Sequence, residues 1–188
     1  MKTNIETSAR HLHLTREDFI LLFNKEKLSV RNYLFSAKDE FAANETVEIV
    51  GPEGRLLNVR IAGPFRDHSQ VEISKTDARN LGIDAPLRLS GDKNGAPIRV
   101  IGPKAEFTKN LAMVPKRHLH LSPKLAEKVK LKHSEQVKIK IGGDRGLVFD
   151  NVIVRVDQRY KNHFHLDTDE ANAAGIDGAS QGEILLKE

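Results

Sequence analysis

The sequence predicts a mainly β protein made of two repeat-related small barrels capped by short α-helices. Three observations predict it: two segments recur along the chain, short apolar strands alternate with turns, and helix-capping residues follow at matching places. The 188 residues leave room for two domains of about 90 residues each.

The internal repeat organises the chain. Arg-His-Leu-His-Leu occupies residues 10–14 and recurs at 117–121, which lie 107 positions later. Residues 72–83 align without a gap to residues 165–176, 93 positions later, so the first half carries 14 more residues. We expect those extra residues to form an insertion within 24–44. Two copies are too few for a solenoid, so the repeat indicates two related domains.

Strands and helices are predicted at matching places in both halves. The alternating apolar residues of 47–61 are interrupted by the turn Gly51–Gly54, and those of 137–156 by Gly142–Gly146. Four helix starts follow from capping residues. They are Thr15 with Asp18 in a capping box, Ser122 before Pro123, Ser74 for a helix ending at Gly82, and Asp167 for a helix ending at Gly175.

Composition excludes several classes of function. The chain has no cysteine, which rules out disulfides, cysteine-ligated zinc and a cysteinyl acyl-enzyme. No apolar stretch approaches the length of a transmembrane helix, and residues 1–6 lack the apolar core of a signal peptide. We therefore expect a cytoplasmic protein that binds no membrane. A double-barrel nucleic-acid-binding module remains a rival because the net charge is +4, but 5% aromatic residues without tryptophan disfavour it.

The two His-Leu-His segments are the main candidates for chemistry. Residues i and i+2 of a strand project from the same face with Cα atoms about 6.5–7 Å apart, so two imidazoles there can bind one metal ion. The leucines between them, Leu12 and Leu119, should face the core. A single pair of this kind is more often the polar face of a strand. Its duplication favours metal binding.

Each histidine pair needs a third ligand for zinc. Glu72 and His165 occupy the same position of the repeat, and both residue types bind zinc. The predicted ligand sets are His11, His13 and Glu72 for one metal ion, and His118, His120 and His165 for the other. His163 forms a further His-x-His pair with His165 and competes as a ligand. His68 and His133 are expected at the surface.

Arginines supply candidate anion contacts. Arg66 lies in the tight segment Gly63–His68, where its guanidinium would hold phosphate by two parallel hydrogen bonds. A surface pair between Arg66 and Asp67 is an equally good interpretation of that spacing. Arg10 and Arg117 precede the histidine pairs and should face away from them, in a structural or supporting role. Weaker candidates for anion contact are Arg145 and Arg155.

Taken together, these residues resemble the phosphate propanoyltransferase family of PduL-type phosphotransacylases. The likeness covers nearly the whole chain, and many members have Asn where this chain has Ala9. It rests on the following motifs. They are Ser-x-Arg-His-x-His-Leu at 8–14, Glu-Thr-Val with Val-Gly-Pro-x-Gly at 45–54, Gly-Pro-x-Arg with Gln-Val-Glu-Ile-Ser at 63–74, Ser-Gly-Asp at 90–92, Lys-Arg-His-x-His-x-Ser-Pro at 116–123, Arg-Gly-Leu-x-Phe-Asp-Asn-Val at 145–152 and His-x-Asp-Thr-Asp-Glu-Ala-Asn-Ala-Ala-Gly at 165–175.

The resemblance implies a fold and a site. It implies that the N-terminal strand is exchanged, so that one barrel spans 10–115 and the other combines 1–9 with 116–188. It also implies two metal ions, usually zinc, on the six ligands named above, and a phosphate-binding, catalytic Arg66. A homodimer is expected. Because the first histidine is already at position 11, we expect no N-terminal encapsulation extension.

The activity implied is the interconversion of a short-chain acyl-CoA plus phosphate with acyl phosphate plus CoA. With no cysteine available, phosphate would attack the thioester carbonyl directly. The alternative is a dizinc hydrolase of a thioester or phosphate substrate that uses the same ligands to activate water. Formation of acyl phosphate when phosphate is added distinguishes the two.

Overall fold

The structure, a computed structural model, describes residues 1–186. Its contacts divide the chain into two compact units. Unit 1 comprises Met1–Ser8, Phe35–Lys38 and residues from Lys116 onward, and unit 2 comprises Ala9–Leu34 and Asp39–Pro115. Residues 35–38, inside the expected insertion, therefore belong with unit 1.

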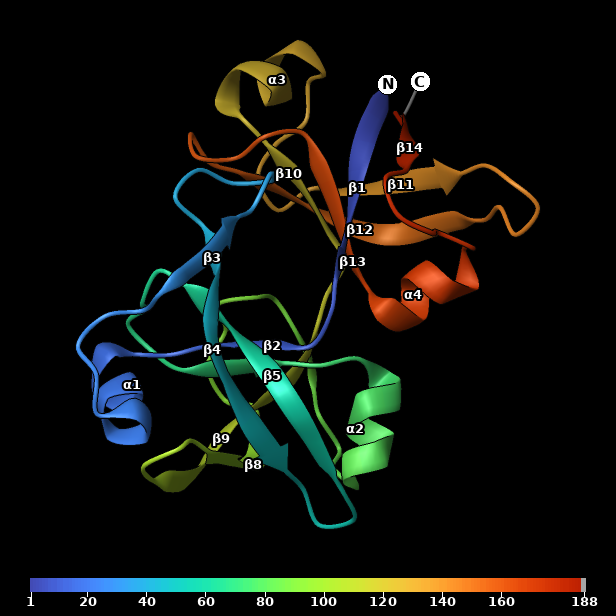
Figure 1. The fold of residues 1–188 in the computed structure, drawn as a ribbon. Coiled ribbons are helices and arrows are strands. Elements are labelled where there is room, and N and C mark those ends of the chain that lie inside the picture. The colour runs from blue at the N-terminus through green and yellow to red at the C-terminus, as the bar shows by residue number, and fades with distance from the viewer. Residues whose placement is uncertain (187–188) are drawn as a thin grey trace. The chain divides into compact units, whose positions relative to one another are not determined.

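Unit 1 is a closed barrel of six strands in the order β1-β13-β10-β12-β11-β14 (Figure 1). Its strands are β1 (Lys2–Ser8), β10 (His118–Leu121), β11 (Gln136–Ile141), β12 (Val148–Val156), β13 (His163–Asp167) and β14 (Gln181–Leu185), and its helices are α3 (Pro123–Lys128) and α4 (Thr168–Ala173). β1 runs parallel to β13 and antiparallel to β14, so the first strand of the chain closes a barrel made otherwise of its last third.

Unit 2 contains a second ring of six strands, in the order β4-β5-β2-β6-β9-β8 and back to β4. Its strands are β2 (His11–His13), β3 (Val30–Tyr33), β4 (Phe41–Val50), β5 (Arg55–Gly63), β6 (Gln70–Glu72), β7 (Leu87–Arg88), β8 (Ala96–Ile101) and β9 (Glu106–Pro115), and its helices are α1 (Arg16–Phe23) and α2 (Lys75–Leu81). β3 and β7 pair outside the ring, with β4 and β9.

The two barrels have the same topology. β2 lies antiparallel to β6 and parallel to β5, as β10 lies antiparallel to β13 and parallel to β12. β9 takes in unit 2 the place that β1 takes in unit 1. β1 directly precedes β2 in the chain but belongs to the barrel of β10. β9 directly precedes β10 but belongs to the barrel of β2. The prediction of a mainly β chain with two repeat-related barrels and an exchanged first strand is confirmed.

The predicted helix starts are present, with one difference in detail. Ser74 and Asp167 form complete capping boxes with the third residues of α2 and α4, and Thr15 and Ser122 cap α1 and α3. The box expected between Thr15 and Asp18 is only half formed. The Asp18 carboxylate instead accepts a hydrogen bond from Ser69 Oγ at 2.6 Å and pairs with Lys109. The Thr15 N–H, which a complete box would direct at Asp18, donates to Ser69 Oγ at 3.0 Å.

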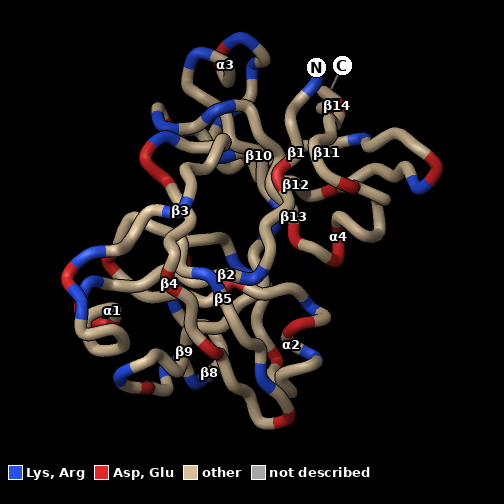
Figure 2. The backbone as a smooth tube through the Cα atoms, viewed as in Figure 1, with Lys and Arg blue, Asp and Glu red and all other residues tan. Residues whose placement is uncertain are grey.

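Each barrel has its own apolar core. Leu12, on β2, and Leu119, on β10, are both fully buried, as the strand alternation predicts. Lysines and arginines are interspersed with acidic residues along both units (Figure 2), so an anion site must come from a local group of side chains. Among the described residues, no helix has the length and apolar character needed to span a membrane.

Candidate metal centres and anion site

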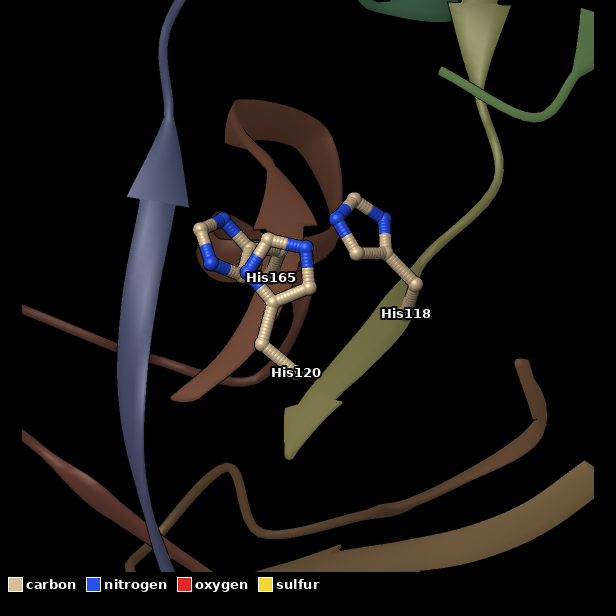
Figure 3. Close-up of side chains that lie close together, drawn as sticks. All are labelled: His118, His120 and His165. Carbon is tan, nitrogen blue, oxygen red and sulfur yellow. The ribbon is translucent and has the colours of Figure 1, made fainter. Parts of the chain in front are cut away.

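Three buried imidazoles converge in unit 1 (Figure 3). β10 and β13 are paired so that His118 lies opposite His165, and His120 follows two residues later on the same face of β10. The ring centroids of His120 and His165 are 4.4 Å apart, and those of His118 and His165 are 4.9 Å apart. The fold therefore brings together the three residues predicted as one ligand set.

The imidazole nitrogens of this cluster have the properties of metal ligands. His118 Nδ1 lies 2.9 Å from the Lys116 carbonyl oxygen, which orients this ring. Both ring nitrogens of His120 are buried without a protein hydrogen-bond partner in the described part of the chain. Burial, and next the neighbouring His165, lower the pKa of His120, so its imidazole is neutral. Buried neutral nitrogens without partners fit a metal ion.

The second cluster, in unit 2, has the same construction with a carboxylate in place of one imidazole. His11 lies opposite Glu72 in the pairing of β2 with β6. The Glu72 carboxylate oxygens lie 3.7 Å from His11 Nε2 and 3.9 Å from His13 Nε2. Two ligands of one tetrahedral zinc ion are about 3.3 Å apart, so a small inward movement would complete a site.

Backbone carbonyls orient both histidines of this cluster. His11 Nδ1 is 2.9 Å from the Ala9 oxygen, and His13 Nδ1 is 3.0 Å from the Ala62 oxygen. Each Nε2 is thereby directed at Glu72. Burial, and next the Arg66 charge, lower the pKa of His13 well below its usual value, which keeps this ring neutral as well.

Arg66 lies beside the carboxylate of this cluster. Its Nη1 is 3.9 Å from Glu72 Oε1 and 3.4 Å from both Gln70 Oε1 and Ser90 Oγ. Ser90 Oγ also donates to Glu72 Oε1 at 2.6 Å. Asp67, the alternative partner considered for Arg66, is hydrogen-bonded to His68 at 2.7 Å. A partly exposed guanidinium thus adjoins a ligand set that could hold a metal ion.

The other residues singled out in the sequence have different surroundings. His163 lies opposite His120 in the strand pairing, but it is outside the three-residue group that the geometry selects. His133 accepts a hydrogen bond from the Val156 N–H at an exposed position. Arg10 and Arg117 contact carboxylates of α2 and α4. Arg145 donates to the Ala173 carbonyl, and Arg155 lies over the Tyr160 ring.

Comparison with known proteins decides the family. A family model described as phosphate propanoyltransferase matches residues 4–177. The chain belongs to the phosphate propanoyltransferase family. It is 48% identical over 182 residues to the phosphate propanoyltransferase of Escherichia fergusonii, covering 95% of this chain and 86% of the relative. It is also 48% identical to that of Klebsiella pneumoniae, covering 97% and 88%, and 44% identical to that of Limosilactobacillus reuteri, covering 97% and 87%.

Membership of the phosphate propanoyltransferase family makes the chain an enzyme of the acyltransferase class. The sequence patterns did not predict two residues that lie at the candidate sites, Ser90 and Tyr160. Ser90 belongs to the Ser-Gly-Asp motif of the family resemblance, and only this motif could have indicated it. Tyr160, whose ring stacks on His120 with centroids 3.6 Å apart, is in no motif or repeat that would have indicated it.

Proposed function

We propose that the protein is a phosphate acyltransferase that converts a short-chain acyl-CoA and phosphate into acyl phosphate and CoA, and also catalyses the reverse reaction. The observation that carries the proposal is Arg66 next to Glu72: a cation suited to phosphate adjoins a set of metal-binding side chains. The phosphotransacylase activity in the names of the relatives supports it.

Two zinc ions are proposed, one on His118, His120 and His165 and one on His11, His13 and Glu72. When bound, zinc supplies Lewis acidity that stabilises a departing thiolate and offsets the charge of phosphate oxygens. The donor chemistry supports this assignment, because neutral imidazole and carboxylate are both zinc ligands. We assign the three-histidine cluster to the coenzyme A sulfur and the Glu72 cluster to phosphate.

Arg66 is the proposed phosphate-binding and catalytic residue. Its guanidinium would hold two phosphate oxygens and direct a third at the thioester carbonyl carbon. The new C–O bond forms as the C–S bond breaks. The electron pair leaves with sulfur, and the proton lost by hydrogen phosphate ends on the thiol of CoA. Because the chain has no cysteine, a cysteinyl intermediate is impossible, and both substrates should be bound together.

The test is an assay of the zinc-loaded protein with acetyl-CoA and with propionyl-CoA, each with and without phosphate. We expect release of CoA to require phosphate and acyl phosphate to accumulate, with kinetics that show a ternary complex. His133→Ala is the matched control, because this histidine lies outside both clusters. Equal release of CoA without phosphate, with free acid as product, would instead establish a hydrolase.

A further inference from the structure

The arginine that precedes each histidine pair makes the same kind of contact in both units. Arg10 holds the Asp77 carboxylate at both oxygens, with Nε to Oδ2 at 3.0 Å and Nη2 to Oδ1 at 2.8 Å. Arg117 donates from Nη1 to Glu170 Oε1 at 2.7 Å and from Nε to the Asp150 carbonyl oxygen at 2.7 Å. The repeat has therefore kept an arginine–carboxylate pair.

The two partner carboxylates occupy equivalent places. Asp77 is the third residue of α2, in a capping box with Ser74, and Glu170 is the third residue of α4, in a capping box with Asp167. Each capping residue lies two positions after the third predicted ligand of its unit, Glu72 or His165. The carboxylate that the arginine grips thus belongs to the helix that directly continues the third ligand's strand.

These pairs join the two strands that carry each ligand set. β2 and β6 have only three residues each, so few backbone hydrogen bonds fix β6, and with it Glu72, relative to His11. The hydrogen bonds from Arg10, the residue before His11, to Asp77 in the first turn of α2 hold the chain at a second point, just beyond Glu72. The Asp77 side chain is only 3% exposed, so this pair is shielded more than an ordinary surface salt bridge.

We propose that Arg10 and Arg117 are positioning residues, each holding the third metal ligand of its own unit in place through the capping carboxylate of the following helix. The inference rests on the proposed metal centres. Each arginine acts on one cluster: Arg10 on Glu72 and Arg117 on His165. Neither guanidinium needs to touch substrate for this role.

The test measures zinc affinity of one cluster at a time, by competition with a chromophoric chelator. His120→Ala leaves the Glu72 cluster to be measured, and His13→Ala leaves the three-histidine cluster. In these backgrounds Arg10→Gln should weaken zinc binding at the Glu72 cluster about 10- to 100-fold, and Arg117→Gln should do the same at the three-histidine cluster. Each arginine substitution should change the zinc affinity of the other cluster less than twofold. Arg99→Gln, which removes a surface arginine of unit 2, is the control.

A double-mutant cycle checks the route of action. Asp77→Asn keeps a capping side chain but loses the charge that Arg10 grips, so it should weaken the Glu72 cluster as Arg10→Gln does. The double variant should then be no weaker than either single one. Additive losses would mean that Arg10 does not act through Asp77, and would overturn the inference.

Two further outcomes would also overturn it: unchanged affinities, or equal weakening of both clusters with a lower Tm, which would indicate general destabilisation. If the wild type binds no zinc at all, the proposed metal centres fail, and hydrogen exchange of the metal-free protein decides the inference. Arg10→Gln should then speed exchange of the amides in β6 and the first turn of α2, with no change in β13 and α4. Unchanged exchange would refute the positioning role.

Discussion

Replacing Tyr160 by leucine should weaken metal binding at the three-histidine cluster and leave the Glu72 cluster unchanged. The Tyr160 ring stacks on His120 with centroids 3.6 Å apart and planes inclined by 8°. His118 is oriented by a backbone carbonyl, whereas no protein group described in the structure hydrogen-bonds either nitrogen of His120. The stacked tyrosine is therefore the nearest of the three rings that orient His120, ahead of His165 and His118.

The expected loss follows from this contact. An aromatic pair contributes about 0.5–1.5 kcal/mol beyond the area it buries, which corresponds to a roughly 2- to 13-fold weaker zinc affinity. Tyr160 is itself held in place by backbone hydrogen bonds on both sides. The Lys161 N–H donates to the Ser36 carbonyl at 2.9 Å, and the Arg159 carbonyl accepts from the Lys38 N–H at 2.9 Å. The variant should consequently alter the ring contact more than the path of the backbone.

Chelator competition on Tyr160→Leu and Tyr160→Phe, supported by the absorption spectrum of the cobalt-loaded protein, measures the effect. Tyr160→Phe keeps the stacked ring and should bind zinc within twofold of the wild type. Unchanged affinity in Tyr160→Leu would refute the reasoning. A phenylalanine variant as weak as the leucine variant would show that the hydroxyl, rather than the ring, supports the site.

The remaining predictions concern metal content, phosphate and pH. Elemental analysis of carefully purified protein should find two zinc ions per chain, and His118→Ala should reduce this to one; a metal-free protein that neither zinc nor cobalt activates would contradict the proposal. Arg66→Lys keeps the charge but loses the two-pronged geometry, so steady-state kinetics should show the KM for phosphate rising about tenfold or more while that for acyl-CoA changes little; unaltered phosphate kinetics would remove Arg66 from the site. In the metal-free protein, burial lowers the pKa of His13 and His120, so both stay neutral when folded but take up protons near pH 6.5 when unfolded. Stability is thus fully present above pH 6.5 and is lost below it by about 1.4 kcal/mol per pH unit for each histidine; urea denaturation at pH 7.5 and 5.5 measures this, and equal stabilities would show that the rings are not buried neutral.

The sequence was sufficient for those features that depend on local pattern. Alternation along a strand places His118 and His120 on one face, and the repeat gives His165 the position that Glu72 has in the other half. Capping residues likewise located the starts of four helices. In these cases the interactions that determine the structure span only a few residues, or the same residues occur in both halves of the chain.

Features that depend on distant segments could not be derived in this way. The surroundings of Arg66 include Ser90, which lies 24 residues later and follows β7, a strand that pairs with β9 outside the ring. Tyr160 reaches His120 from the loop between β12 and β13, and the equivalent loop of unit 2, between β5 and β6, contains no tyrosine. The exchange of the first strand was expected from the family resemblance alone, because a strand of alternating residues carries no signal for which of two similar barrels it joins.

The place of β1 in its barrel also determines an order of events during synthesis. Its residues leave the ribosome well before those of its partners β13 and β14. At about 5–20 residues per second, β1 must wait roughly 8–32 s before Glu6 can pair with His165. The ring of β2, β4, β5, β6, β8 and β9 is contiguous in the chain and can close on the nascent polypeptide while β1 still has open edges. Once residue 115 has emerged from the ribosome, the nascent chain would therefore hold one complete barrel and a single strand of the other.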